Sequence, residues 1–459
     1  MNTAVVLRAM LPEHLLLLGL VLVLVLELLG RARHASGVAL VFVAIAALSA
    51  LALAADGVSA VPFAGHFSID PATASAKAVV LALALPVLLI ARHEFHGAEF
   101  PALLMSSLYG IALMLSADSF LTLFLGLELM SLPVYVLVLL AHRRIASAEA
   151  ALKYLVLGGT GSAMLLMGAS LIYGSSGSLA SSAYTQALSS ADPMVRAGVV
   201  LVLLALFLKS AIVPFHGWAP DAYEGASVPV TAHMAVLVKA GVMLAALRLV
   251  GGATLGSPLV EIVALLPLAS IVWGNLAAMR QASLRRLIAY SSIAHAGYLF
   301  YALLGDPATR LQAVVFYVAA YGLLNLLAFA ALPAMDNDTE RDRLDNLQGL
   351  FHRAPFAALM IGLAMLSLAG IPPLPGFIAK FLIFRNVMVA GHTGYAVAGL
   401  VASYLGLYFY LRVIQLMFMN PDARVAPATP LRAATVASLA CLAATLLLAV
   451  FPGWLMARL

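Results

Sequence analysis

Four ionisable side chains lie deep inside long apolar segments, where a charge needs either a partner or water. They are Glu128, Lys209, Lys239 and Lys380. At 1.5 Å per residue from the start of its segment, Glu128 lies about 15 Å along a helix, Lys239 about 16 Å and Lys209 about 21 Å. A charge at the centre of a bilayer costs about 2.5 to 3.5 kcal/mol, so each of these residues is a candidate for function.

One carboxylate and three lysines at such depths favour proton transfer. A lysine removed from water releases its proton more readily, and a nearby carboxylate holds that proton in place. Making and breaking the contact between the two therefore moves a proton without a metal ion. The alternative is a static buried ion pair that orders the helices.

Three histidines in or beside the apolar segments, His216, His233 and His295, are candidates for accessory proton transfer. Histidine exchanges protons near neutral pH, but a buried histidine is more often a hydrogen-bonded structural residue. The spacing of the three histidines does not indicate a haem site.

Proline interrupts two of the apolar segments, each beside one of the lysines. Pro214 follows Lys209 by five residues, and Pro372, Pro373 and Pro375 precede Lys380. Proline removes a backbone donor, and the freed carbonyl groups must face protein or water rather than lipid. The breaks therefore indicate polar sites inside the membrane.

The composition requires a membrane to surround these residues. Of 459 residues, 64% are hydrophobic and 10% are charged, whereas an ordinary soluble domain has about 25% charged residues. The basic residues form no run that would favour nucleic acid. Cys441 is the single cysteine, which excludes disulfides within the chain, a cysteine-ligated iron–sulfur cluster and a c-type haem.

Apolar stretches bounded by charge, proline or glycine predict an all-α membrane protein with about fourteen spans. The seventh and twelfth are the two that proline breaks. The predicted spans are 11–29, 37–54, 74–91, 101–116, 118–140, 150–173, 195–218, 228–250, 256–279, 287–303, 311–333, 355–384, 393–419 and 431–455. The first is too long for a cleavable signal peptide.

The lysines and arginines outside the spans divide unevenly between the two sides. Alternate sides collect thirteen and seven of them, and Lys77 belongs to the smaller group. By the positive-inside rule the larger group is cytoplasmic, so both chain ends are predicted to lie outside. Lys153, Lys209, Lys239, Lys380 and Arg412 remain within spans.

The two broken spans are five apart and therefore cross the membrane in opposite directions. Paired interrupted spans indicate inverted repeats around a central site. We predict a single membrane domain, 1–459, with three leading spans at about 11–91, repeats at about 101–250 and 256–419, and a last span at about 431–455. The alternative is that the prolines only kink packed helices.

Several segments resemble a known family. The motifs GLELMSLPVYVL (126–137), WAPDAYEGASVPVTA (218–232), YSSIAHAGY (290–298) and LAGIPPLPGFIAKF (368–381) look like those of the antiporter-like subunits of bacterial NADH:quinone oxidoreductase, or respiratory complex I, and of its subunit N family in particular. KYLVLGGTGSAMLLMGASLIYGSSGSL (153–179) adds a fifth match. The segment AHMAVLVKAG (232–241) differs, with His233 and Met234 where the family commonly has small or aromatic residues.

The resemblance implies a fourteen-helix fold with two inverted five-helix repeats, and a proton-translocating role. It implies proton transfer by Glu128, Lys209, Lys239 and Lys380, with Lys153 and His295 as accessory residues. It places NADH, FMN, iron–sulfur clusters and quinone on partner subunits of the membrane and peripheral arms, with no cofactor or metal site in this chain. The implied location is the bacterial inner membrane, with both termini periplasmic.

Two other functions remain open. A subunit of a multisubunit cation/proton antiporter or of a membrane-bound hydrogenase would share the architecture. A purely structural spacer would not need deep charges, because apolar helices would suffice.

Overall fold

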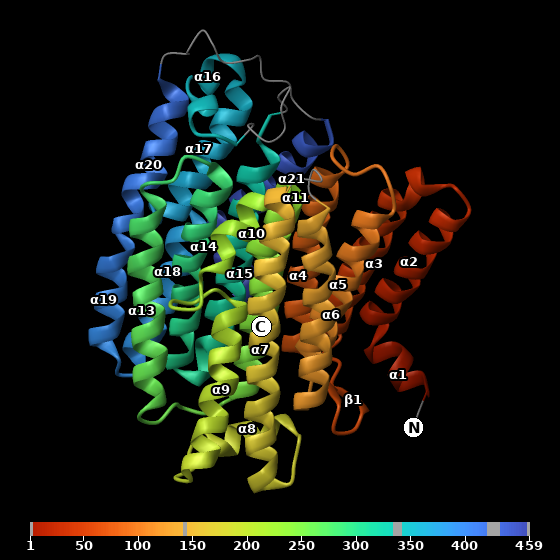
Figure 1. Ribbon diagram of the computed structural model, residues 1–459, viewed down its shortest axis with the longest axis vertical. Helices are drawn as coiled ribbons and strands as arrows, with labels where there is room; N and C mark the ends of the chain where they lie inside the picture. The colour runs from red at the N-terminus through yellow and green to blue at the C-terminus, as the bar shows by residue number, and fades with distance from the viewer. Residues whose placement is uncertain (1–2, 141–144, 334–341, 420–431, 457–459) are drawn as a thin grey trace.

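The computed structural model describes residues 3–140, 145–333, 342–419 and 432–456, most of which are helical. A short antiparallel hairpin, β1 (Ala60–Phe63) with β2 (Phe67–Ile69), joins two of the helices. The strand β1 and the short helix α8 (Ser181–Ala187) lie at one end of the molecule, and α16 (Leu350–Arg353) lies at the opposite end (Figure 1). The predicted α-helical membrane architecture is confirmed for the described residues.

Twelve helical segments of the described chain are long and apolar enough to cross a membrane, and each coincides with one predicted span. They are α2 (Leu11–Leu28), α3 (Ala35–Ala55) with η1 (Ala32–His34), α4 (Pro71–Ala91), α5 (Glu99–Ser116), α6 (Phe120–Leu139), α7 (Ile145–Ser176), α11 (Val228–His233) with η2 (Met234–Val238) and α12 (Lys239–Val250), α13 (Leu259–Ala278), α14 (Leu284–Tyr301) with η3 (Ala302–Leu304), α15 (Pro307–Ala330), α19 (Thr393–Ser403) with α20 (Leu405–Phe418), and α21 (Arg432–Val450).

The other two predicted spans are the broken ones, and both breaks are present. The predicted seventh span contains most of α9 (Pro193–Lys209) and ends where α10 (Trp218–Gly225) begins, and the predicted twelfth span contains α17 (Pro355–Ala369) and most of α18 (Pro375–Val389). Twelve segments of the described chain are long enough to cross a membrane, and the count of fourteen remains a prediction.

Each break has a local cause in the backbone. After Lys209, Ala211 takes a φ of 61°, and Gly370 after α17 takes a φ of 91°. The left-handed region ends an α-helix, and glycine enters it without steric cost. Pro375 then starts α18, where its missing N–H would have no helical partner. The lysines Lys209 and Lys380 are thereby held at helix interruptions.

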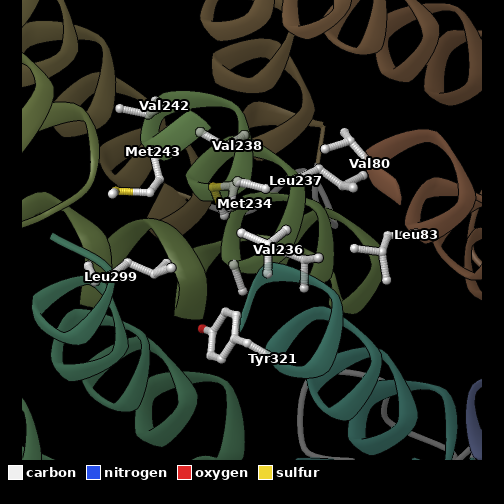
Figure 2. Packing of buried hydrophobic residues seen from close by; sticks show 14 of the residues in the cluster. Val80, Leu83, Met234, Val236, Leu237, Val238, Val242, Met243, Leu299 and Tyr321 are labelled. Carbon is white, nitrogen blue, oxygen red and sulfur yellow. The ribbon is translucent and has the colours of Figure 1, made fainter. Parts of the chain in front are cut away.

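The core lies among the central helices rather than at the edges. The segments α11–η2–α12, α14 and α15 bury nearly all of their residues, whereas α2, α3 and α21 bury about one third. Figure 2 shows side chains from four elements of this core: Val236 of η2, Leu83 of α4, Leu299 of α14 and Tyr321 of α15. The exposed apolar faces of α2 and α3 suit lipid or a partner subunit.

The η2 segment, just before Lys239, is π-helical. A π-helical turn inserts one extra residue into the helical ladder and is frequent at functional sites. It therefore changes the direction in which Lys239 leaves the helix relative to the residues of α11.

An ion pair joins Arg285, at the start of α14, to Asp342, which lies outside the membrane-spanning segments. Arg285 donates from Nη2 and Nε to the Asp342 carboxylate at 2.8 and 2.9 Å. Burial alone would raise the pKa of Asp342, but the charge and hydrogen bonds of Arg285 hold it below its usual range.

The short elements α1 (Thr3–Ala9), η4 (Asp345–Leu347) and α22 (Pro452–Met456) complete the described part of the chain. Five of the arginines that were assigned to one side of the membrane lie outside the described residues: Arg143, Arg144, Arg341, Arg424 and Arg458.

Candidate functional site: a buried glutamate and lysine line

The first site is a loose pair between Glu128 and Lys209. Glu128 on α6 lies 3.5 Å from Nζ of Lys209 at the end of α9. The same Nζ lies 3.2 Å from Oγ of Ser131 and 3.3 Å from the hydroxyl of Tyr135. Lys209 is 2% exposed and Glu128 is 21% exposed in the isolated chain. The lysine therefore has two neutral oxygens as alternatives to the carboxylate.

The helix α7 completes the surroundings of Glu128. Ser162 on that helix donates to the Glu128 carboxylate. On the other side, Nε1 of Trp218 donates to the carbonyl of Leu208 at 3.0 Å, which ties α10 to the end of α9. Trp218 of α10 thus bridges the helix interruption that follows Lys209.

The second site is Lys239, the first residue of α12. Its amine donates to both the hydroxyl and the backbone carbonyl of Ser292 on α14. The Ser292 hydroxyl also lies 3.4 Å from that of Tyr223 on α10. Within the described ranges no carboxylate lies within ion-pair distance of Lys239, so neutral oxygens alone surround it.

The third site is His295, three residues after Ser292 on α14. Its Nδ1 lies 2.6 Å from the hydroxyl of Tyr317, and its Nε2 lies 3.1 Å from that of Tyr410. The Tyr410 hydroxyl is also 2.6 Å from Ser291. A histidine between two hydroxyl groups can accept a proton on one nitrogen and release one from the other.

The fourth site is Lys380 on α18, beside the second break. Its amine donates to the carbonyl of Ala369, the last residue of α17, at 3.2 Å. It also lies 5.1 Å from the ring centre of Tyr298 on α14, within the range of a cation–π contact. The break thus supplies a backbone carbonyl to the lysine.

One face of α14 connects the second and fourth sites. Ser292, His295 and Tyr298 follow one another at a spacing of three residues, so they share a face of the helix. The first contacts Lys239 and the last contacts Lys380. Of these three, only His295 was a candidate from the sequence. The spacing of three residues could also have identified Ser292 and Tyr298, whereas no spacing in the sequence points to Tyr317 or Tyr410.

The structure does not bring all accessory candidates to this line. His233 is fully buried and lies 2.9 Å from Ser107 on α5. The ring of His216 is half-buried and packs near Trp273 of α13, at 6.1 Å between ring centres. No hydrogen bond within the described chain joins either histidine to the deep lysines.

Lys153 is part of a separate charged cluster. Its amine lies 2.7 Å from Glu149 and 2.8 Å from Asp221, and the Lys153 side chain is 44% exposed in the isolated chain. Arg286 binds the same Asp221 at 3.0 Å and also Glu224 at 2.7 Å. Lys153 therefore lies in a partly exposed ion-pair network rather than deep inside its span.

Lys77, which was counted among the basic residues outside the spans, lies inside α4. It is 1% exposed and forms an ion pair with Glu13 of α2, which is also 1% exposed. This pair could not be predicted from the sequence, because each residue stands near a predicted span end, where an interfacial charge is the ordinary expectation. Only the three-dimensional packing of α2 and α4 shows that the side chains of Glu13 and Lys77 are in contact.

Among the residues that the structure describes, no group of three or more histidine, cysteine, aspartate or glutamate side chains could hold a metal ion.

Comparisons with known proteins agree with this architecture. Residues 117–406 match the family described as NADH:quinone oxidoreductase/Mrp antiporter, TM. NADH-quinone oxidoreductase subunit N of Pelobacter propionicus is 38% identical over 90% of this chain and 89% of its own length. The subunit N of Methylobacterium nodulans is 37% identical over 91% of this chain and 89% of its own length.

Solved structures give the same result. A chain of respiratory complex I from Thermus thermophilus with bound aureothin superposes with a TM-score of 0.85 and 34% identity, covering 97% of this chain and 98% of that chain. A chain of the Mrp complex from Dietzia has a TM-score of 0.85 at 24% identity, covering 98% of this chain and 96% of its own, and shows the shared fold alone. The chain is a multi-pass membrane protein and belongs to the NADH-quinone oxidoreductase subunit N family.

Proposed function

We propose that this chain moves protons across the membrane as subunit N of a bacterial NADH:quinone oxidoreductase, complex I. Its proton-transfer line consists of Glu128, Lys209, Lys239 and Lys380. The observation that carries the proposal is the Glu128–Lys209 contact, in which a buried lysine lies between one carboxylate and two hydroxyl groups. Such a lysine can exchange a charged partner for neutral ones over a very short distance.

The cycle begins when electron transfer in partner subunits alters the position of Glu128. Lys209 then keeps only neutral partners, Ser131 and Tyr135, and its ammonium form loses the stabilisation of a nearby negative charge. The proton leaves Lys209 for Lys239, which is held by Ser292. From Lys239 it follows the α14 face through His295 to Lys380.

The chain acts as one membrane domain in this proposal. Repeats at about 101–250 and 256–419 each supply half of the path, opening to opposite sides. Both termini lie on the periplasmic side of the bacterial inner membrane. Lys153, His216, His233 and His295 are accessory proton-transfer residues, of which His295 has the most direct contacts with the line.

The redox chemistry belongs to partners. Other membrane-arm and peripheral-arm subunits bind NADH, FMN, iron–sulfur clusters and quinone, and this chain binds none of them. Its single cysteine, Cys441, supports this division because iron–sulfur clusters need several thiolate ligands.

A second candidate function is a subunit of a multisubunit cation/proton antiporter, because the Dietzia Mrp chain shares the fold. Mass spectrometry of the co-purified complex separates the two functions. Flavin and iron–sulfur subunits that bind NADH support complex I. Small antiporter subunits without them would support the alternative.

The direct test replaces Lys239 in the assembled enzyme. Lys239→Ala removes the proton carrier, and Lys239→Arg keeps a positive charge that does not deprotonate in proteins. Both variants are expected to lose proton uptake into inverted membrane vesicles during NADH oxidation. If Lys239→Arg pumped normally, Lys239 would be a structural charge, and the proposed line would be wrong.

A further inference from the structure

A cavity at the same end of the molecule as Arg92 lies beside the start of α11. It has a volume of about 460 Å³ and is lined by Glu94, His96, Glu99, Leu140 and Ser227. The loop between α4 and α5 supplies Glu94 and His96, and Glu99 is the first residue of α5. The helix α11 begins directly after Ser227, and Leu140 is the C-cap of α6. The cavity therefore opens between exposed polar groups and a buried helix end.

Two polar atoms of the segment 227–233 have no hydrogen-bond partner among the described residues. They are Oγ of Ser227, which lines the cavity, and Nδ1 of His233, six residues further into the span. Ser227 is 1% exposed and His233 is 0% exposed. Six helical residues span about 9 Å. Buried polar groups almost always have a partner, so each of these two atoms is a candidate to bind water.

The hydrogen bonds of Ser107 fix which nitrogen of His233 is the free base. The single hydroxyl hydrogen of Ser107 is donated to the carbonyl of Met130 at 3.0 Å, because a carbonyl can only accept. The Ser107 oxygen must then accept from Nε2 of His233, 2.9 Å away. Nε2 carries the hydrogen, and Nδ1 is left as a buried acceptor that can bind one proton.

A series of contacts also connects His233 to the first lysine site. The carbonyl of Met130, which holds Ser107, is followed on α6 by Ser131, whose hydroxyl is 3.2 Å from Nζ of Lys209. Ser107 and the consecutive α6 residues Met130 and Ser131 therefore connect His233 to Lys209.

We propose that the cavity lined by Glu94, His96, Glu99 and Ser227 is the opening through which protons enter from the side of Arg92, and that His233 is the first buried residue to receive them. Nδ1 receives a proton that water carries from the cavity along the segment 227–233, and it passes the same proton on towards Lys209, so the ring ends each cycle neutral. Ser107 is a positioning residue that holds the tautomer. This inference rests on the proposed proton transport and assigns its uptake route.

The first test measures access and does not depend on pumping. In a Cys441→Ala background, Ser227→Cys is treated with the membrane-impermeant reagent MTSET, applied to either side of the membrane, and the labelled subunit is weighed by mass spectrometry. Ser147→Cys is the matched control, since Ser147 is equally buried and its hydroxyl is bonded to Gly225 at 2.7 Å. We expect labelling of position 227 only from the Arg92 side and none at 147. No labelling at 227, or labelling from the opposite side, would overturn the inference.

The second test measures transport in the assembled enzyme. His233→Ala should lower the rate of proton uptake about tenfold, which is less than the roughly hundredfold or more that a proton-transfer group at the reacting atoms contributes. Ser107→Ala should have a smaller effect, and Ser107→Thr, which keeps the hydroxyl, should restore the rate. His14→Ala, which removes a histidine from α2, is the control. If His233→Ala pumps as well as His14→Ala while Lys239→Ala does not pump, this inference fails and the proposed function stands; if Lys239→Ala pumps normally, the proposed function itself fails.

Discussion

Two glutamate–lysine pairs lie inside this chain, and they differ in how tightly they are closed. Glu13 and Lys77 are in direct contact, and each is 1% exposed. Glu128 and Lys209 are 3.5 Å apart, and the carboxylate is 21% exposed. Lys209 has Ser131 and Tyr135 as further partners, whereas Lys77 forms no other hydrogen bond within the described residues.

The difference shows why burial alone does not identify a proton-transfer residue. A closed pair is held by the full attraction between two charges in a medium of low dielectric constant, so separating it is costly. A loose pair with neutral oxygens nearby can open and still leave the lysine hydrogen-bonded. We infer that Glu13–Lys77 joins α2 to α4 and that Glu128–Lys209 changes partners.

The largest expected effect on stability is at the closed pair. Lys77→Met leaves Glu13 buried without its partner and should destabilise the packing of α2 on α4 by about 3 to 5 kcal/mol. Thermal denaturation of the purified complex, followed by the loss of this subunit, measures the change. The double variant Glu13→Met with Lys77→Met should recover most of the stability. If Lys77→Met pumped poorly per assembled complex, the closed pair would also belong to the transport path.

The loose pair should show the opposite pattern. Lys209→Met should lower proton uptake by about tenfold or more, because a proton carrier is lost. Stability should change less than for Lys77→Met, since Glu128 is partly exposed and keeps its bond from Ser162. Proton uptake and thermal denaturation are measured on the same preparation. A variant as unstable as Lys77→Met but with normal transport would contradict the distinction between the pairs.

A smaller effect is expected from removing one neutral partner of Lys209. Tyr135→Phe deletes a hydroxyl that lies 3.3 Å from the amine. A hydrogen bond contributes about 0.5 to 1.5 kcal/mol, which corresponds to a change of about twofold to tenfold in an equilibrium between the two partners. Initial rates of proton uptake measure it. Tyr154→Phe is the control, because the Tyr154 ring packs against Tyr135 at 4.6 Å between ring centres without a hydrogen bond to Lys209.

The smallest effect near neutral pH concerns the pair between Arg285, at the start of α14, and Asp342, which lies outside the membrane-spanning segments. The pKa of Asp342 is lowered by Arg285, although burial opposes this shift. A carboxyl group with a lowered pKa stabilises the folded state above its unfolded pKa of about 3.9, and the contribution is lost as pH falls through the lower folded value. Thermal stability should therefore stay constant between pH 7 and pH 5 and fall below about pH 4. In Asp342→Asn this acid-dependent loss should be smaller.

The sequence was sufficient for the features that depend on local chemistry. The breaks after Lys209 and before Lys380 follow from proline, and the depth of Glu128 follows from helix length. The pairing of Glu13 with Lys77 could not be predicted, because the two residues are 64 positions apart and either could reach the interface. Tyr317 and Tyr410 were missed for the same reason, since single tyrosines in apolar helices carry no spacing signal.

Other features of the site differ in whether the sequence could have indicated them. Ser292 and Tyr298 share the spacing of His295, so a search for polar residues three apart would have identified them from the sequence. The π-helical turn before Lys239 gave no such signal, because one extra residue in a helical ladder depends on packing against α15 and α4. The predicted inverted repeats remain a prediction.

The most direct measurement compares matched substitutions in the two pairs. Glu128→Gln and Glu13→Gln each remove one buried negative charge, and the protons taken up per NADH oxidised are measured in inverted vesicles that contain equal amounts of assembled complex. We predict that Glu128→Gln lowers proton uptake severalfold and that Glu13→Gln leaves uptake per complex unchanged. An unchanged rate and stoichiometry in Glu128→Gln would contradict proton transfer through the Glu128–Lys209 pair.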